Sequence, residues 1–178
     1  MVASTIAFTS MGASAELIST DWKTAGDNLI TLDEATGLEW LDLTETTDMS
    51  INEVEGLLAT TFEGFRLPTG MEVYNMMQTA FPAPMEAMEI HQDMIFTDGA
   101  TDALAYEFGE LFGQADLPYP DRYSYGAYKG ADGTSTLGAG VENRVSEDYA
   151  KIYMNRAMSD NTENLDWDSI FFGVFLVS

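Results

Sequence analysis

The sequence predicts a single α+β domain with two to three helices around a small, mostly antiparallel sheet. Short runs of alternating or wholly apolar residues, typical of strands, recur at 28–32, 38–43, 149–157 and 170–177. Helix-start signals at Ser50 and Thr69, and an apolar stripe at helical spacing over 104–112, predict the helices between them. The chain has 178 residues, is 46% hydrophobic and shows no repeat or linker, so one domain over 16–178 with one core is expected.

The first pair of strands is predicted to form a hairpin. Strands at 28–32 and 38–43 flank a five-residue loop in which Asp33 can accept backbone N–H bonds and Gly37 can supply a positive φ. Trp40 lies in the second strand, and an aromatic residue of that size is expected to anchor the core.

Two helices are predicted from capping boxes, in which a hydroxyl at the N-cap and a carboxylate three residues later satisfy the first backbone donors. Ser50 is followed by Glu53, and Thr69 by Glu72. The expected helices span 51–59 and 70–79, and Pro82 and Pro84 are expected to end the second.

Arg66 lies between these helices and is one of only seven basic residues. We expect it to hold the start of the second helix through an internal ion pair or bonds to backbone carbonyls. Substrate binding is the alternative. Trp40, Arg66, Thr69 and Glu72 are therefore assigned structural roles.

Composition excludes several classes of function. Thirty acidic and seven basic residues give a net charge of −23, which repels phosphate backbones and makes nucleic acid an unsuitable partner. The absence of cysteine excludes thiolate nucleophiles and thiolate metal sites, and a single histidine excludes multi-histidine sites within the chain. The charge fits an acidic surface suited to a saline habitat, and it leaves a calcium site open.

The first fifteen residues predict a signal peptide. Residues 1–15 carry no charge and end in Ala13-Ser14-Ala15, the small-residue pattern of a cleavage site, although no basic residue precedes the apolar run. The mature domain is then 16–178, secreted or periplasmic. A retained first strand is the alternative. No later stretch is apolar enough over about 20 residues to span a bilayer.

The candidate ligand-binding residues are tyrosines in the segment 114–140, which is rich in glycine and is predicted to be irregular. Exposed tyrosines in such a segment are typical of surfaces that bind sugars or proteins. The residues concerned are Tyr123, Tyr125 and Tyr128. The alternative is that they line the second half of the core.

Oxygen ligands for calcium are dense between 160 and 168. The candidate metal ligands are Asp160, Asp166 and Asp168. The alternative is a solvated turn, since the segment lacks the central glycine and distal glutamate of a helix–loop–helix calcium loop. No cofactor is required by the sequence.

A Cu(I) site is a weaker hypothesis. Thioether and imidazole groups recur every three residues, and soft ligands of this kind bind Cu(I). They are Met85, Met88, His91 and Met94. The alternative is a methionine-lined core face.

Three stretches resemble an exported bacterial domain found at the C-terminus of collagen-like adhesins and in proteins with PEP-CTERM sorting tails. They are 36–40 (TGLEW), 64–69 (GFRLPT) and 173–177 (GVFLV). The RLPT stretch is also similar to an element of formylglycine-generating enzymes. Both groups have C-type-lectin-like folds, so the resemblance implies a C-type-lectin-like domain in which Trp40 and Arg66 are neighbours in one core closed by the final apolar strand.

The resemblance implies a binding or adhesion module that recognises a sugar or a protein surface, with calcium as an optional aid. The chemistry of the formylglycine-generating enzymes needs cysteine and is not carried over, and the acidic charge disfavours sulfated glycans. Two alternatives stay open: a structural subunit of a surface layer or extracellular fibre, and a hydrolase that uses paired carboxylates. We expect a binding protein rather than an enzyme.

Overall fold

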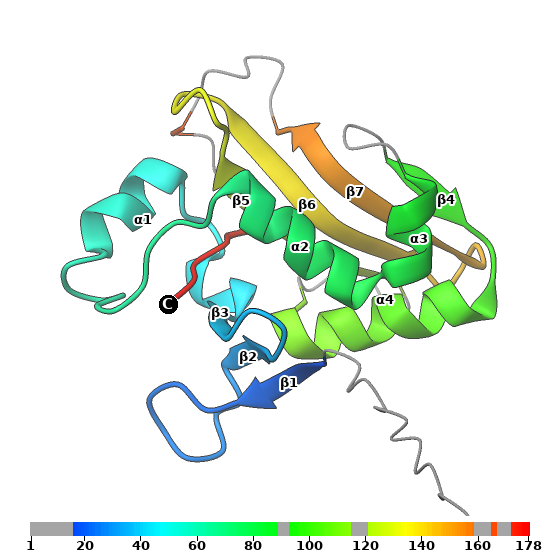
Figure 1. Cartoon of the computed structure of the whole chain (residues 1–178), viewed down its shortest axis with the longest axis horizontal. Helices are drawn as coiled ribbons and strands as arrows, with labels where there is room; N and C mark the ends of the chain where they lie inside the picture. The colour runs from blue at the N-terminus through cyan, green and yellow to red at the C-terminus, as the bar shows by residue number, and fades with distance from the viewer. Residues whose placement is uncertain (1–15, 89–92, 115–120, 159–164, 167–171) are drawn as a thin grey trace, which may run out of the picture.

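The structure of the protein, a computed structural model, describes residues 16–88, 93–114, 121–158, 165–166 and 172–178. These residues form an α+β fold with a three-stranded sheet, a five-stranded sheet and four α-helices (Figure 1). The predicted α+β class is confirmed, but the prediction of two to three helices around one small sheet missed a helix and the second sheet. Among the helices of the described residues, none combines the length and apolarity that a membrane span requires.

The smaller sheet contains the predicted hairpin. Its antiparallel strands lie in the order β1 (Leu17–Thr20), β2 (Ile30–Asp33) and β3 (Leu38–Leu41). The Asp33 side chain accepts the Ala35 N–H at 2.9 Å, and Gly37 has a φ of +74°, as expected of this loop. β3 ends two residues earlier than predicted, because Asp42 caps a short 3₁₀-helix, η1 (Leu43–Thr46).

The larger sheet has the strand order β4-β7-β6-β5-β8, and only β5 and β8 pair in parallel. Its strands are β4 (Met94–Phe96), β5 (Arg122–Lys129), β6 (Thr136–Arg144), β7 (Tyr149–Ala157) and β8 (Gly173–Val174). The prediction of an irregular segment over 114–140 is wrong, since this stretch holds β5 and the start of β6. Its glycines suggested loops, but Gly126, Gly138 and Gly140 lie within strands whose neighbouring side chains need the space, and only Gly130 and Gly133 lie in the turn between them.

Both capping boxes form as predicted. The helices are α1 (Ile51–Leu57), α2 (Gly70–Ala80), α3 (Pro82–Ala87) and α4 (Gly99–Phe112), with Gly113 closing α4 at a φ of +81°. Pro82 follows the end of α2 but also begins α3, which was not predicted. A proline in the first turn of a helix is favourable because its missing N–H would have no partner there.

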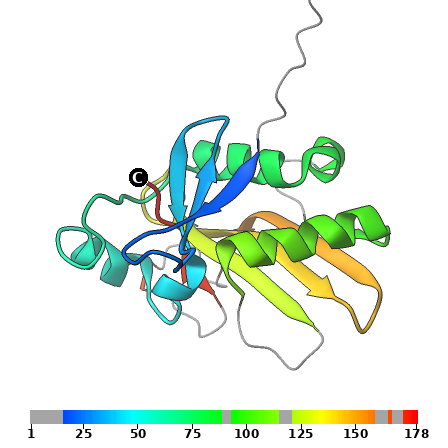
Figure 2. The same ribbon diagram turned by 90° about the horizontal axis from the view of Figure 1, so that it is seen from below.

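The main core lies between the larger sheet and α2, α3 and α4, which cover one of its faces (Figures 1 and 2). Trp40, Phe112, Tyr128 and Phe175 are fully buried in this core. A second cluster, which includes Ile51 of α1, fills the space beside the C-terminal segment.

The C-terminal segment is buried but is not the central strand that the sequence predicted. Its described part, 172–178, contributes only the two-residue strand β8 at the sheet edge. It then leaves the sheet, and Val177 pairs with both Trp40 and Arg66. The predicted proximity of these two residues is therefore confirmed, and the final apolar residues lie between them.

This pairing is made by backbone hydrogen bonds on both sides of the chain. Arg66 and Val177 exchange two N–H···O bonds, each of 2.9 Å. On the other side the Leu41 N–H donates to the Leu176 carbonyl at 3.1 Å, and the Ser178 N–H donates to the Glu39 carbonyl at 3.0 Å. The segment thus joins the small sheet to the start of α2.

Arg66 also holds the first turn of α2 through Glu72. Its guanidinium donates to both oxygens of the Glu72 carboxylate, at 2.6 and 2.9 Å, and to the Leu67 carbonyl at 3.2 Å. The same carboxylate accepts the Thr69 N–H at 2.7 Å. The hydrogen bonds from Arg66, with those from Thr69, outweigh partial burial and lower the pKa of Glu72 to about 2.

We expect Phe175→Ala to lower the free energy of unfolding by about 3–5 kcal/mol, because it empties a closely packed site. The Phe175 ring meets Trp40 edge-on at 5.8 Å and Phe112 at 6.4 Å. Denaturant unfolding measures the effect. Val145→Ala, at a residue that is 54% exposed, is the control and should change stability by no more than about 0.5 kcal/mol. A loss below about 1 kcal/mol for Phe175→Ala would contradict this packing.

Glu72→Gln should lower stability at pH 7 by roughly 0.5–1 kcal/mol, since the Arg66–Glu72 pair is partly exposed. The folded-state pKa of Glu72 lies below its ordinary value of 4.5, so this contribution is complete above pH 4.5 and is lost as pH falls through about 2. Denaturant unfolding across this range measures it. Glu53→Gln alters the other capping box, which has no arginine partner in the described residues, and should cost less at pH 7. Equal losses in the two variants would show that the ion pair adds nothing.

Candidate functional site

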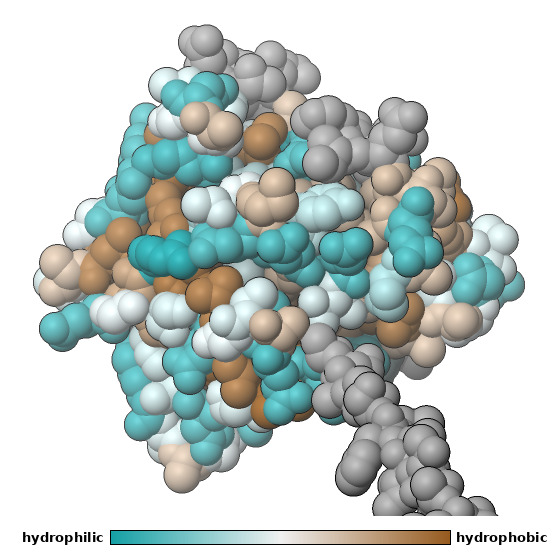
Figure 3. Space-filling model, in the orientation of Figure 1, coloured by the Kyte–Doolittle hydropathy of each residue, from teal (hydrophilic) through white to brown (hydrophobic). Residues whose placement is uncertain are grey.

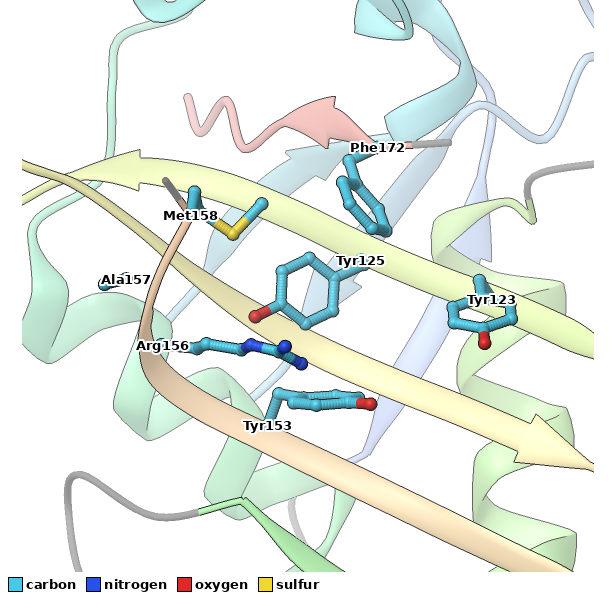
Figure 4. Close-up of a pocket in the computed structure, with 7 residues that line it drawn as sticks. All are labelled: Tyr123, Tyr125, Tyr153, Arg156, Ala157, Met158 and Phe172. Atoms are coloured by element: carbon cyan, nitrogen blue, oxygen red, sulfur yellow. The ribbon is translucent and has the colours of Figure 1, made fainter. Parts of the chain in front are cut away.

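A pocket of about 360 Å³ lies on the face of the larger sheet opposite to α4. Ile152 and Met154 pack in the core with Phe108 of α4, so Tyr153 between them points to the other face. The lining residues come from β5, from β7 and the residue after it, and from the residue before β8 (Figure 4). They are Tyr123, Tyr125, Tyr153, Arg156, Ala157, Met158 and Phe172.

Glycines in the central strand β6 make this hollow. In the strand register, Gly140 lies between Tyr125 and Tyr153, and Gly138 lies between Ala127 and Arg156. A Cβ atom added to Gly138 would stand 2.4 Å from the Tyr125 ring, too close for any real side chain. Because β6 has no side chains at these two positions, the tyrosines of the flanking strands have room over the sheet.

A buried carboxylate fixes two of the tyrosines. Glu142 of β6 is only 6% exposed, and it accepts hydrogen bonds from the Tyr123 hydroxyl at 2.5 Å, from the Tyr153 hydroxyl and from Nε of Arg144. Burial acts to raise the pKa of Glu142, but these donors outweigh it and hold the pKa below its ordinary value. Glu142 is therefore ionised, and its oxygens are engaged by these residues.

Tyr125 differs from the other two tyrosines because its hydroxyl is buried and has no hydrogen-bond partner among the described residues. The residue is 4% exposed, and its ring packs against Tyr153 at 5.2 Å and Phe172 at 4.8 Å. Burial raises the pKa of the Tyr125 hydroxyl, so it is neutral and can both donate and accept. A buried polar group without a partner costs free energy, which makes this hydroxyl a candidate ligand contact.

Arg156 places a cation in the pocket. Its guanidinium lies 4.9 Å from the centre of the Tyr153 ring, and Figure 4 shows it reaching toward the Tyr125 hydroxyl. Five of the seven basic residues form ion pairs with carboxylates. Within the part of the chain that the structure describes, no carboxylate lies within 4.0 Å of the Arg156 side-chain nitrogens.

The pocket therefore combines aromatic faces with hydrogen-bond donors. None of its lining residues in the described chain carries a carboxylate. The nearby Glu142 is bound by its own donors, so the described residues of the pocket do not include a pair of free carboxyl groups.

The structure separates the three tyrosines that the sequence grouped. Tyr123 and Tyr125 share the pocket, whereas Tyr128 is fully buried in the core on the opposite face, and its hydroxyl bonds to Asn155. The alternative prediction, that these tyrosines line the core, is therefore correct for Tyr128. One side of Tyr128 touches a second, largely apolar hollow of about 720 Å³ beside the start of α2, where Figure 3 shows apolar surface between α1 and α2.

The proposed metal ligands are only partly within the described residues. Asp160, Asp168 and His91 lie outside them. Asp166 accepts a hydrogen bond from the Asn52 side chain at 2.6 Å, and the described residues contain no group of three or more metal-binding side chains.

The methionines of the copper hypothesis pack in the main core. Met85 and Met88 are buried there, and Met94 of β4 packs against the same cluster. These three positions match the alternative interpretation, a core face lined by methionine.

Sequence reasoning missed Tyr153, Arg156 and Phe172. The alternation over 149–157 was recognised and could have placed Tyr153 on the face opposite to Ile152. The pairing of Gly140 with both Tyr125 and Tyr153 could not be found, because it depends on the order and register of three strands.

No protein-family model, no curated protein and no solved structure matches this chain.

Proposed function

We propose that the protein is a secreted or periplasmic binding module of the C-type-lectin-like kind, whose pocket on the larger sheet takes a sugar ring. The observation that carries the proposal is the Tyr125 hydroxyl, which no other described residue hydrogen-bonds, in a pocket walled by aromatic rings. Pockets of about 300–1,000 Å³ that are mostly apolar and hold a few converging polar groups are typical of small-ligand sites.

The chemistry of the walls supports a saccharide. A sugar ring has C–H faces that pack on aromatic rings and hydroxyls that need hydrogen-bond partners. Tyr153 and Phe172 flank Tyr125 at 5.2 and 4.8 Å and supply the rings. Tyr125 and Arg156 supply the polar contacts, and tyrosine is well suited to such surfaces because it joins an apolar body to a polar tip.

The placement of the family motifs supports the lectin-like architecture. The stretches 36–40, 64–69 and 173–177, which resemble the exported bacterial domain, meet where Val177 pairs with Trp40 and Arg66. Motifs that are distant in sequence thus form one structural unit. The extracytoplasmic location rests on the signal-peptide pattern of residues 1–15, which lie outside the described residues.

Ala157→Trp should abolish saccharide binding by the wild-type protein while leaving the fold intact. Ala157 lines the pocket and is exposed, so a tryptophan there fills the hollow without crowding the core. Binding to an array of neutral and acidic oligosaccharides, followed by isothermal titration with the best ligand, measures the effect.

Ala59→Trp is the matched control, because Ala59 is also exposed but does not line the pocket. It should bind like the wild type. The proposal is wrong if the wild type binds no saccharide, or if Ala157→Trp binds as tightly as Ala59→Trp.

A further inference from the structure

We propose that the saccharide bound in this pocket is an acidic one, a uronic acid whose carboxylate pairs with Arg156. The inference rests on the proposed sugar-binding function and specifies the chemical class of its ligand. It follows from the kinds of polar group that the pocket offers and from the kinds that it lacks.

Donors exceed acceptors in the pocket. The Arg156 guanidinium has five N–H donors and no acceptor. The hydroxyls of Tyr123 and Tyr153 use their protons on Glu142, while the Tyr125 hydroxyl retains a proton to donate. A carboxylate offers only acceptors, so it matches this set better than a neutral hydroxymethyl group does.

Arg156 is held where it can receive such a group. The Tyr153 ring supports its guanidinium at 4.9 Å, and Glu142 fixes that ring through the Tyr153 hydroxyl. A planar guanidinium stacked on a ring keeps its edge free for a two-pronged contact with a carboxylate. Arg156 itself is exposed, so a ligand can reach its guanidinium from solvent.

The charge of Glu142 does not oppose the ligand directly. The Arg144 guanidinium donates to Glu142 and, at 3.2 Å, to Asp121. The Glu142 carboxylate therefore already has a cation beside it. Among the described residues Arg156 forms no ion pair within 4.0 Å. The nearby Asp93 carboxylate interacts with Arg156 only at longer range and is paired with Lys151 at 2.6 Å.

The net charge of −23 predicts an unusual salt dependence for this binding. The overall field repels an anion at long range, while the contact with Arg156 attracts it at short range. Salt screens the long-range repulsion most, so the association rate of an acidic sugar should rise with NaCl concentration, in contrast to binding at a basic surface.

The test compares uronic acids with their neutral counterparts, as the methyl glycosides of glucuronate and glucose, galacturonate and galactose, and mannuronate and mannose. The wild type should bind at least one acid roughly tenfold more tightly than its neutral partner, the factor expected from one charge-assisted contact. Arg156→Gln should remove this preference by weakening binding of the acid roughly tenfold more than binding of its neutral partner, whereas Arg156→Lys should retain part of the preference. Lys23→Gln, which changes net charge equally at an exposed residue remote in sequence from the pocket residues, should retain all of it.

The outcomes separate this inference from the proposed function. If neutral sugars bind as tightly as the acids, or if Arg156→Gln keeps the preference for the acid, the inference of an acidic ligand is wrong, while the proposed sugar-binding function is retained. If acetate at the same concentration displaces the uronic acid, the pocket is a simple carboxylate site and the inference fails. If no glycoside of either kind binds, both proposals fall.

Discussion

The fold depends on the backbone pairing of the last three residues with two segments that are remote in sequence. Val177 exchanges two hydrogen bonds with Arg66, while Leu176 and Ser178 pair with the hairpin strand β3. Leu176 and Val177 are fully buried, so their N–H and C=O groups must be satisfied by protein. This requirement aligns the small sheet, the start of α2 and the end of the chain. The capping box and the Arg66–Glu72 pair then fix the direction in which α2 leaves.

The pocket results from the different side chains that the two faces of the larger sheet carry. One face of the sheet is covered by helices, and its side chains are small or aliphatic at Ala139, Val141 and Ile152. The other face carries tyrosines on the flanking strands, and the glycines of β6 make space between them. Glu142 then uses its charge to orient two of the tyrosines. Tyr125 and Arg156 remain as the groups that a ligand can engage, and the proposed function follows from them.

Local signals in the sequence predicted local structure well. The capping boxes at Ser50 and Thr69 and the turn at Asp33–Gly37 depend on neighbouring residues, so the residues themselves identify them. The proximity of Trp40 and Arg66 came from a resemblance and is confirmed by their shared pairing with Val177. The role of the terminal apolar run was mistaken. Full burial suggested a central strand, but a segment can also be buried by leaving a sheet edge and running between other elements.

The candidate site was only partly predictable. Tyr123 and Tyr125 were identified from their type, but the glycine content of their segment suggested an irregular loop instead of a strand. Tyr128 lies on the opposite face because strand neighbours alternate, and the correct strand assignment would have separated it from Tyr125. Arg156 could not be found, since only the pairing of β6 with β7 brings it to the tyrosines of β5.

Native-state hydrogen exchange tests the central role of the C-terminal pairing most directly. The amides of Leu41, Arg66 and Val177 donate the hydrogen bonds that hold the segment. They should exchange only through global unfolding, with the same opening free energy as the slowest amides of the central strand β6. Exchange of the Arg66 and Val177 amides through a local opening that is about 3 kcal/mol or more easier than global unfolding would contradict the account.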